Sequence, residues 1–237
     1  MKYAFVDYRI TDEEKANLHD LGCSIVTCPP SPLLYSAICG HPDMLMHFIA
    51  KNKVIVHKDM DINFINFIKN LNFQVCYTSN SLRNSYPFDI LLNALNLENY
   101  FVHNINFTDK NLLCSISNKK LIQVKQGYTK CSTAIVNDKA LITSDKSIYK
   151  ALDSEDIDIL LLPPGDINLP GLDYGFIGGT CGLLDKKLVF YGNLKNYKYE
   201  DLVLKFLDKH EVEPYYLSSG PLVDRGSIFF AQNHTLI

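Results

Sequence analysis

The sequence predicts an α/β fold in which five units, each made of strand, turn, strand and helix, close into a ring. When the units are aligned on their hairpin turns, corresponding positions follow one another at 46, 40, 48 and 47 residues. These positions are Asp43, Asp89, Thr129, Ile177 and Asp224. A period in this range is typical of repeat architectures. Neither end carries a polar capping repeat, which favours a closed ring, because a ring has no ends to cover.

The unit is clearest in the middle of the chain. Gly127 belongs to a turn signal, and residues 134–136 form a short apolar strand. Residues 137–139, Asn-Asp-Lys, are typical of a hairpin turn, and residues 140–142 form the returning strand. Asp145 is a suitable N-cap for the helix that follows, because its carboxylate can accept from the free N–H groups of a helix start. The rest of the chain repeats this order.

The first unit is preceded by a strand and a helix. Residues 1–7 are predicted to be a strand that completes the ring beside the last unit. Thr11 begins a helix that runs to about Leu21, where Gly22 is a typical stop. The further predicted strands are 23–27, 44–49, 54–56, 73–77, 90–95, 100–102, 112–116, 120–124, 157–162, 175–184, 188–191, 212–217, 223–230 and 235–237, and the further predicted helices are 61–70 and 199–210.

Composition and charge argue against several classes of function. The chain has 23 Lys and Arg against 26 Asp and Glu, a net charge of -3, and no basic tract, which argues against nucleic acid as a partner. No apolar run reaches transmembrane length, so no membrane association is expected. The N-terminus is too short and too charged for a signal peptide, which favours a cytoplasmic location.

The cysteines predict free thiols. There are seven of them, and no Cys-x-x-Cys is present, so the sequence predicts neither a zinc site nor any other metal or cofactor. Cys23 and Cys76 lie within apolar strands and are expected to pack in the core. The remaining cysteines include the candidates for chemistry.

Two short segments place reactive residue types at the start of predicted strands: residues 40–43 (Gly-His-Pro-Asp) and residues 127–133 (Gly-Tyr-Thr-Lys-Cys-Ser-Thr). Together with the five units, they resemble the pentein superfamily, whose fold is a five-bladed, pseudo-fivefold α/β propeller. Its members include arginine and agmatine deiminases, dimethylarginine dimethylaminohydrolases, amidinotransferases and the non-catalytic translation initiation factor 6. The resemblance covers residues 1–237, which are expected to form a single domain with repeats of roughly 45 residues.

The first segment is similar to the Gly-His-x-Asp motif that precedes an apolar strand in the deiminases. The resemblance implies that His41 shuttles protons and that Asp43 orients it or binds substrate. A histidine that merely ends a turn before a strand is the alternative interpretation, since a His-x-Asp pair is common.

The second segment is similar to the deiminase nucleophile segment and implies that Cys131 is the nucleophile, with the neighbouring Lys130 favouring its thiolate. A buried structural cysteine is the alternative. Cys181 is a rival nucleophile because it follows Gly178-Gly179, although it lies two residues deeper in its strand, which favours burial. The glycine pair itself can let a ligand or another backbone segment approach closely.

The chemistry of the family explains these residue types. A thiolate attacks the guanidinium carbon, histidine moves protons, and carboxylates bind the planar cation. Asp89 and Asp224 stand at positions that correspond to Asp43, so the three carboxylates are expected to converge on one cleft beside Tyr128. The family nucleophile normally lies in the last repeat, whereas Cys131 lies in the third. Two hypotheses follow: a cysteine-dependent enzyme acting on a small cationic guanidino compound or a related amidine or amide, or a non-catalytic pentein that binds a small ligand or a protein.

Overall fold

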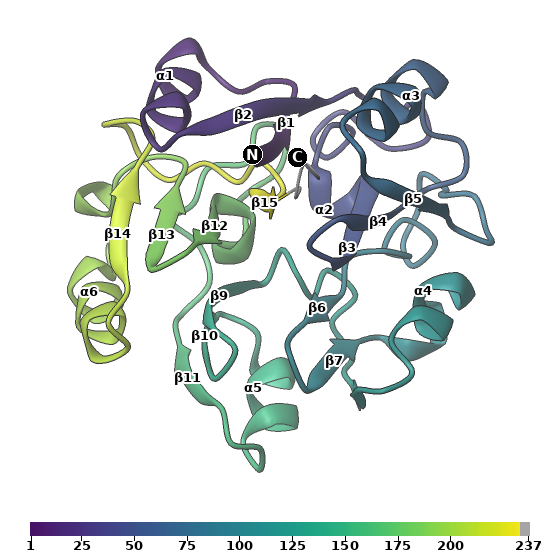
Figure 1. The fold of residues 1–237 in the computed structure, drawn as a ribbon. Helices are drawn as coiled ribbons and strands as arrows, with labels where there is room; N and C mark the ends of the chain where they lie inside the picture. The colour runs from purple at the N-terminus through teal and green to yellow at the C-terminus, as the bar shows by residue number, and fades with distance from the viewer. Residues whose placement is uncertain (233–237) are drawn as a thin grey trace.

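The computed structural model describes residues 1–232 of the 237. The predicted strand at 235–237 therefore lies outside the described residues. Figure 1 shows small sheets set around a common centre, with helices toward the outside. The strands are β1 (Lys2–Asp7), β2 (Cys23–Cys28), β3 (Met46–Ala50), β4 (Lys53–Val56), β5 (Gln74–Tyr77), β6 (Leu95–Asn96), β7 (Tyr100–His103), β8 (Lys120–Gln123), β9 (Thr133–Asn137), β10 (Ala140–Thr143), β11 (Asp158–Leu161), β12 (Cys181–Leu184), β13 (Lys187–Phe190), β14 (Glu213–Tyr216) and β15 (Phe229–Gln232).

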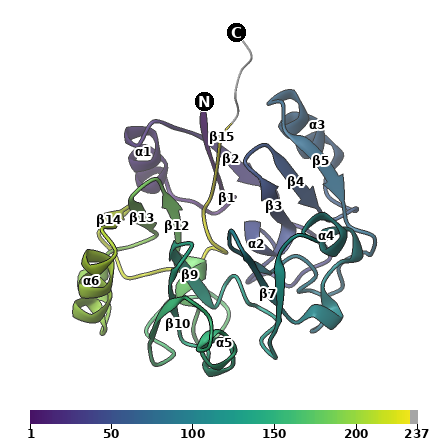
Figure 2. The ribbon, with the colours of Figure 1, turned by 60° about the horizontal axis from the view of Figure 1, so that its bottom comes forward.

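These strands form five three-stranded sheets with one common pattern. The strand orders are β15-β1-β2, β3-β4-β5, β6-β7-β8, β9-β10-β11 and β12-β13-β14. In each sheet the first-named strand is antiparallel to the second, and the second is parallel to the third. We call the first-named strands, β3, β6, β9, β12 and β15, the inner strands, because Figures 1 and 2 show the labelled members of this group nearest the centre.

A helix connects the two parallel strands of every sheet, as a parallel pair requires, because a hairpin cannot join strands that run in the same direction. These helices are α1 (Asp12–Asp20), α3 (Ile62–Asn70), α4 (Lys110–Ser115), α5 (Lys146–Leu152) and α6 (Glu200–Lys209). Short turns α2 (Pro42–Leu45), η1 (Ile105–Phe107), η2 (Ile177–Thr180) and η3 (Leu194–Asn196) complete the elements. Thr11 caps α1 in a capping box, and Asp145 caps α5, as predicted.

The N-terminal strand lies beside the last unit, which confirms the sequence-based prediction. Strand β1 pairs antiparallel with β15, with Lys2 opposite Gln232 and Phe5 opposite Phe229. The two ends of the described chain therefore share one sheet, as Figure 1 shows. This arrangement gives the sheet of β15 the same strand pattern as the other four.

Several predicted strand boundaries are wrong. Residues 112–115 belong to the helix α4 rather than to a strand, because the parallel pair β7 and β8 needs a crossover connection. Two inner strands are shorter than predicted, since β6 holds only Leu95–Asn96 and residues 177–180 form the turn η2 before β12, whereas β9 is longer than predicted. The residues before each inner strand turn toward the centre of the molecule instead of joining a ladder.

The observed register also corrects the predicted alignment. Asp43, Lys130 and Gly178 each lie three residues before the first paired residue of their inner strand. Asp43 therefore corresponds to Lys130 and Gly178, one residue later than the predicted Thr129 and Ile177. The hairpin turns of these three units are equally long, at residues 51–52, 138–139 and 185–186, but the turn after β9 begins one residue later than predicted and β12 is one residue shorter than β3 and β9.

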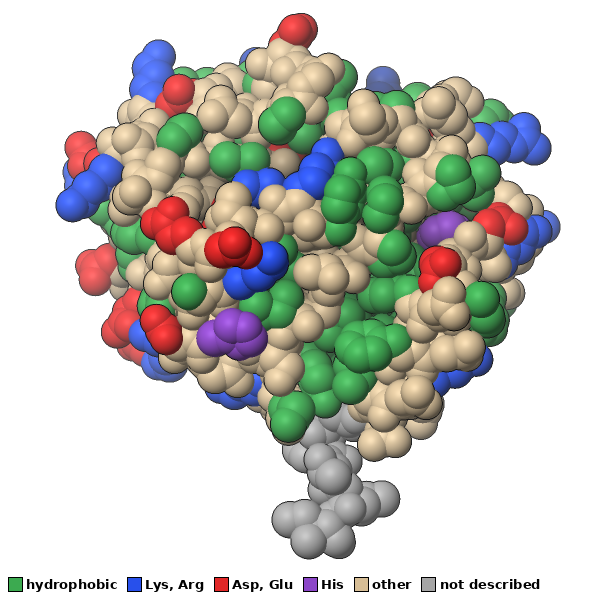
Figure 3. Space-filling model, turned by 90° about the horizontal axis from the view of Figure 1, so that it is seen from above, with side chains coloured by type: hydrophobic (Ala, Val, Ile, Leu, Met, Phe, Trp, Pro, Cys, Tyr) green, Lys and Arg blue, Asp and Glu red, His purple; other side chains and the backbone are tan. Residues whose placement is uncertain are grey.

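Figure 3 shows basic and acidic side chains interspersed over the face that it displays. Within residues 1–232, no helix is both long and apolar enough to cross a bilayer.

Candidate active site

The five segments that precede the inner strands meet at the centre and deliver polar side chains there. His41 and Asp43 come from the turn before β3, and Cys131 comes from the segment before β9. The segment before β15 contributes Asp224 and Ser227. All five of these residues are buried, so the centre of the molecule is a polar cluster rather than an apolar core. Such clusters are costly unless their members satisfy one another.

Cys131 is held by two side chains. Its thiol donates to Asp43 Oδ2 at 3.0 Å, and Asn93 Nδ2 donates to its Sγ at 3.1 Å. Asn93 Oδ1 also accepts from the backbone N–H groups of Cys131 (3.1 Å) and Lys130 (2.9 Å). The sulfur is therefore fixed both through its side chain and through its backbone.

Asp43 connects the sulfur to a buried ammonium group. Its Oδ2 accepts from Ser227 Oγ at 2.7 Å, and Lys130 Nζ donates to the same hydroxyl at 2.9 Å. Asp43 Oδ1 has no hydrogen-bond partner among the described residues. One carboxylate oxygen is thus committed to the cluster, and the other is buried without a hydrogen-bond partner among the described residues.

His41 lies beside the carboxylate of Asp224. Its Nδ1 lies 3.8 Å from Asp224 Oδ1, and neither ring nitrogen has a hydrogen-bond partner among the described residues. Asp224 is fixed by the backbone N–H groups of Phe176 and Gly226, each at 2.9 Å. The imidazole therefore lies beside the Asp224 carboxylate without a hydrogen bond to it, and both ring nitrogens lack a partner among the described residues.

Glycines make this close packing possible. Gly226 has a φ of 70°, and a Cβ at this position would fall on the atoms of His41. A Cβ at Gly179 would fall on the Asp224 carboxylate, and one at Gly178 would fall on backbone oxygens of the segment before β9. The predicted role of the Gly178-Gly179 pair in close approach therefore concerns protein groups.

Burial sets the protonation of the cluster. It raises the pKa of Cys131 well above that of a free thiol, and the neighbouring Asp43 and Asp224 raise it further. Burial lowers the pKa of His41, although Asp224 opposes this shift. Without a ligand, Cys131 is a thiol and His41 is neutral near pH 7. The expectation that Lys130 favours the thiolate is not met, because its ammonium lies beyond Ser227.

A cavity of about 250 Å³ opens above His41, Cys131 and Asp224. Its walls are mainly aromatic and aliphatic, formed by Tyr35, Ile38, Met44, Tyr128, Leu169, Leu172, Tyr174 and Phe176. Asp173 is the other charged residue of the lining, and within residues 1–232 no Lys or Arg lines it. The cavity therefore presents two carboxylates and an aromatic wall.

Of the three carboxylates expected in one cleft, Asp224 lines the cavity beside the imidazole, and Asp43 lies beside the sulfur but is not among the lining residues. Asp89 lies behind the cavity wall and accepts from Tyr128 Oη at 2.6 Å. Tyr128 does line the cavity, as predicted. Asp89 thus holds the tyrosine in place and does not reach the cavity itself.

Cys181 lies apart from this cluster. It is buried, donates to the Ile177 carbonyl at 3.5 Å, and has its pKa raised by burial to about 11. It lines a different cavity, which also receives Lys130. The structure thus brings Cys131 together with His41 and separates both from Cys181.

Residues 5–229 match a family of unknown function, DUF6873. This chain belongs to DUF6873. The sequence matches none of the curated proteins. Among solved structures, it is similar to a mutant of dimethylarginine dimethylaminohydrolase from Pseudomonas aeruginosa in complex with citrulline, at 10% identity and a TM-score of 0.54 over 91% of this chain and 90% of that chain.

Two further structures show the same likeness. An amidinotransferase of saxitoxin biosynthesis from Microseira wollei has 9% identity and a TM-score of 0.54 over 91% of this chain and 74% of that chain. An adduct of dimethylarginine dimethylaminohydrolase with S-methyl-L-thiocitrulline has 8% identity and a TM-score of 0.55 over 91% of each chain. These proteins are penteins, so this DUF6873 member has a pentein-type α/β fold.

Sequence reasoning missed two members of the cluster in this DUF6873 protein. Asn93 is the only polar residue within the apolar run 90–95, and such an isolated amide in a buried segment is a usable signal. Ser227 follows Gly226 and is fully buried. Nothing in the local sequence distinguishes this serine from an ordinary turn residue.

The same cluster has the composition of a metal site. One potential ligand atom from each of His41, Asp43 and Cys131 lies within 4.8 Å of the others. A nitrogen, an oxygen and a sulfur ligand beside an open cavity are compatible with a transition metal such as zinc. They are equally the groups that cysteine-dependent catalysis requires.

Proposed function

We propose that this protein is a hydrolase or transferase that acts on a guanidino compound, or on a related small amidine or amide, with Cys131 as the nucleophile. The observation that carries the proposal is the meeting of Cys131, His41 and Asp43 within 4.8 Å, with Asp224 beside the imidazole, at the floor of a cavity. The pentein-type fold of guanidino-modifying enzymes supports it.

The substrate cation is the activating element in this proposal. Asp224, which lines the cavity, accepts from the N–H groups of the planar amidinium and places its carbon above the sulfur, and the buried Asp43 adds its negative charge behind the sulfur. The bound positive charge offsets the two carboxylates that raise the pKa of Cys131. The thiol is therefore unreactive in the empty cavity and becomes acidic when substrate binds.

The bond changes then follow in order. The thiol proton of Cys131 moves to His41 as the C–S bond forms, and Asp224 stabilises the imidazolium. His41 returns the proton to the leaving amine as the C–N bond breaks. Water, or an acceptor amine in a transferase, then attacks the carbon and gives its proton to His41, and the C–S bond breaks to release Cys131.

The lining of the cavity limits the substrate. Two carboxylates and no cationic residue among the described lining residues favour a cationic ligand over one that carries a carboxylate. The wall of Tyr35, Tyr128 and Phe176 suits an apolar body and a cation–π contact with the head group. The oligomeric state does not enter this argument, since all of these residues come from one chain.

We also propose that residues 1–237 form a single domain, built as a five-bladed α/β propeller from repeats of roughly 45 residues. The common strand pattern of the five sheets supports it. The equal offset of Asp43, Lys130 and Gly178 from their inner strands also supports it.

A non-catalytic pentein that binds a small ligand or a protein partner is the second candidate. The observation that favours it is the state of Cys131, which is only 4% exposed and whose pKa is raised by burial and by Asp43. In that case the cavity binds a cation without reacting with it.

Chloroacetamidine and chloroacetamide separate the two candidates, because both alkylate thiols and only the first carries an amidinium. We expect chloroacetamidine to modify Cys131 before the exposed Cys114, and chloroacetamide to modify Cys114 first. Peptide mapping by mass spectrometry identifies the site, and His41→Ala should slow only the reaction at Cys131. Preferential modification of Cys114 by both reagents would contradict the enzyme proposal and leave the binding protein.

A further inference from the structure

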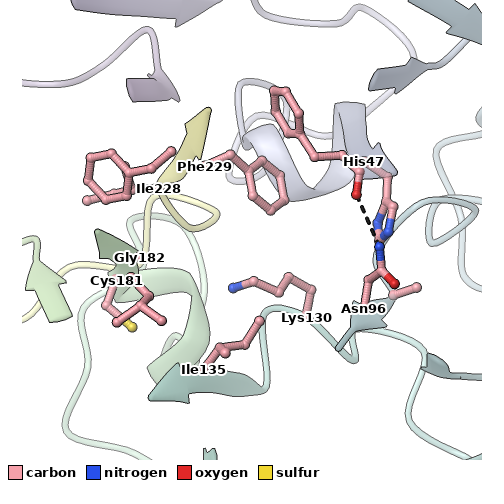
Figure 4. A pocket seen from close by; sticks show the side chains of 12 residues that line it. His47, Asn96, Lys130, Ile135, Cys181, Gly182, Ile228 and Phe229 are labelled. Atoms are coloured by element: carbon pink, nitrogen blue, oxygen red, sulfur yellow. Dashed lines mark hydrogen bonds between the residues drawn. The ribbon is translucent and has the colours of Figure 1, made fainter. Parts of the chain in front are cut away.

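A second cavity of about 230 Å³ lies among the inner strands themselves. Every inner strand or its immediate start contributes to its lining. The lining residues are His47, Phe48, Ala94, Asn96, Lys130, Ile135, Cys181, Gly182, Leu183, Ile228, Phe229 and Phe230. Figure 4 shows the extended Lys130 side chain between Ile135 and Phe229 in the middle of this space.

The second cavity extends further along the inner strands than the active-site cavity does. The active-site residues precede the inner strands, whereas Phe48, Asn96 and Leu183 lie two or three residues into β3, β6 and β12. Lys130 belongs by sequence to the active-site end, but its side chain lines the other cavity. We call this second space the Lys130 cavity.

Among the described residues, the Lys130 ammonium touches no carboxylate directly and reaches Asp43 only through the Ser227 hydroxyl. The residue is 7% exposed, and its Nζ donates to Ser227 Oγ at 2.9 Å and to the Gly178 carbonyl at 3.4 Å. Its other described contact is with the Phe229 ring, whose centroid lies 5.9 Å from Nζ, so at least one of its three N–H groups has no oxygen acceptor among the described residues. Buried charges in proteins are normally paired, and this one has a cavity beside it.

The lining of the Lys130 cavity has the opposite charge to that of the active-site cavity. Among the described residues no Asp or Glu lines it, and Lys130 is its one formally charged group. His47, whose pKa is lowered by burial to about 4, is neutral, and its Nε2 has no partner among the described residues. A second cation lies next to the lining: Lys119 Nζ donates to Oδ1 of the lining residue Asn96 at 2.8 Å.

We propose that the Lys130 cavity binds a small organic monocarboxylate with an apolar body. A single accessible ammonium matches one negative charge, and a carboxylate is an acceptor that it binds strongly. Phe48, Phe229 and Phe230 offer the apolar contacts for the rest of the ligand. The volume corresponds to roughly eight water molecules at their liquid volume, which is enough for an aromatic acid.

An NMR titration with benzoate tests this proposal without any reference to catalysis. We expect saturable shifts of the backbone amides of Ile135, Gly182 and Phe229, with those of Tyr128 and Phe176 unchanged. Benzyl alcohol, which has the same ring and no charge, should bind about tenfold or more weakly. Equal binding of the two compounds, shifts confined to the active-site cavity, or no saturable binding would overturn the proposal.

Two variants locate the site. Lys130→Met should weaken benzoate binding by about tenfold or more, whereas Lys139→Met, at an exposed turn, should leave it unchanged. If Lys130→Met does not fold, Ile135→Trp serves instead, since the larger ring fills the Lys130 cavity and leaves the ammonium in place. Undiminished benzoate binding by a folded variant of either kind would refute the assignment.

Discussion

Gly226 and Gly22 form a matched pair that tests how tightly His41 is held. Both glycines have left-handed backbone conformations, with φ of 70° and 74°. A non-glycine residue in this region costs about 1–2 kcal/mol, so an alanine is strained at either position. The surroundings differ, because a Cβ at Gly22 meets nothing within 4 Å, whereas one at Gly226 falls on His41.

The overlap cannot be relieved easily. His41 is 1% exposed, and the Gly226 carbonyl accepts from the backbone N–H of Asp43 at 3.1 Å, so both sides of the contact are fixed. Overpacking of this kind costs about 1–3 kcal/mol. Gly22→Ala should therefore lose about 1–2 kcal/mol of unfolding free energy, and Gly226→Ala about 2–5 kcal/mol.

Urea unfolding of the two variants measures this difference. The displaced imidazole should also slow the reaction of chloroacetamidine with Cys131 in Gly226→Ala and leave it unchanged in Gly22→Ala. Equal losses of stability in both variants, with equal labelling rates, would show that His41 is not packed against Gly226.

Two further variants address the buried polar groups. Asn93→Ala removes an acceptor of the Cys131 N–H and a donor to its sulfur, and should cost about 2–4 kcal/mol of unfolding free energy in urea. Asn137→Ala, at the half-buried end of β9, removes only an acceptor of the Lys139 N–H and should cost under about 1 kcal/mol, so similar losses in the two variants would contradict the assigned hydrogen bonds. Burial lowers the pKa of His57 to about 4, against about 6.5 in an unfolded chain, so the unfolded state takes up a proton first as the pH falls below 6.5, and the folded state loses stability until about pH 4. Between pH 7 and pH 5 the unfolding free energy of the unmutated protein should therefore fall by about 2 kcal/mol more than that of His57→Gln. The same pH dependence in both proteins would show that His57 takes up protons in the folded state.

The repeating pattern of the fold was accessible from the sequence because its signals are local. Turn residues, the capping residues Thr11 and Asp145, and short apolar runs located most strands and helices. Residues 112–116 were not accessible in this way, since a short apolar run fits a strand or a helix equally well. Only the parallel pairing of β7 with β8, which is non-local, requires a helix there.

The candidate site was predictable in part for the same reason. The segments of His41 and Cys131 carry recognisable motifs, and the structure brings these two residues together. Side-chain direction was not predictable: Lys130 reaches away from the sulfur, and Asp89 lies behind Tyr128. An error of one residue in the register changes such directions, and the polar residues around a hairpin turn do not show at which residue the turn begins.

The most direct test of the account is the pH dependence of Cys131 alkylation by a charged and by a neutral reagent. In the empty cavity, burial and the carboxylates of Asp43 and Asp224 raise the pKa of the Cys131 thiol, and a bound amidinium should lower it. We expect the rate of Cys131 alkylation by chloroacetamidine to begin rising at a lower pH than the rate with chloroacetamide, when both reactions are followed by mass spectrometry. Identical pH profiles for the two reagents would contradict the claim that a cation binds beside Asp224 and activates the thiol.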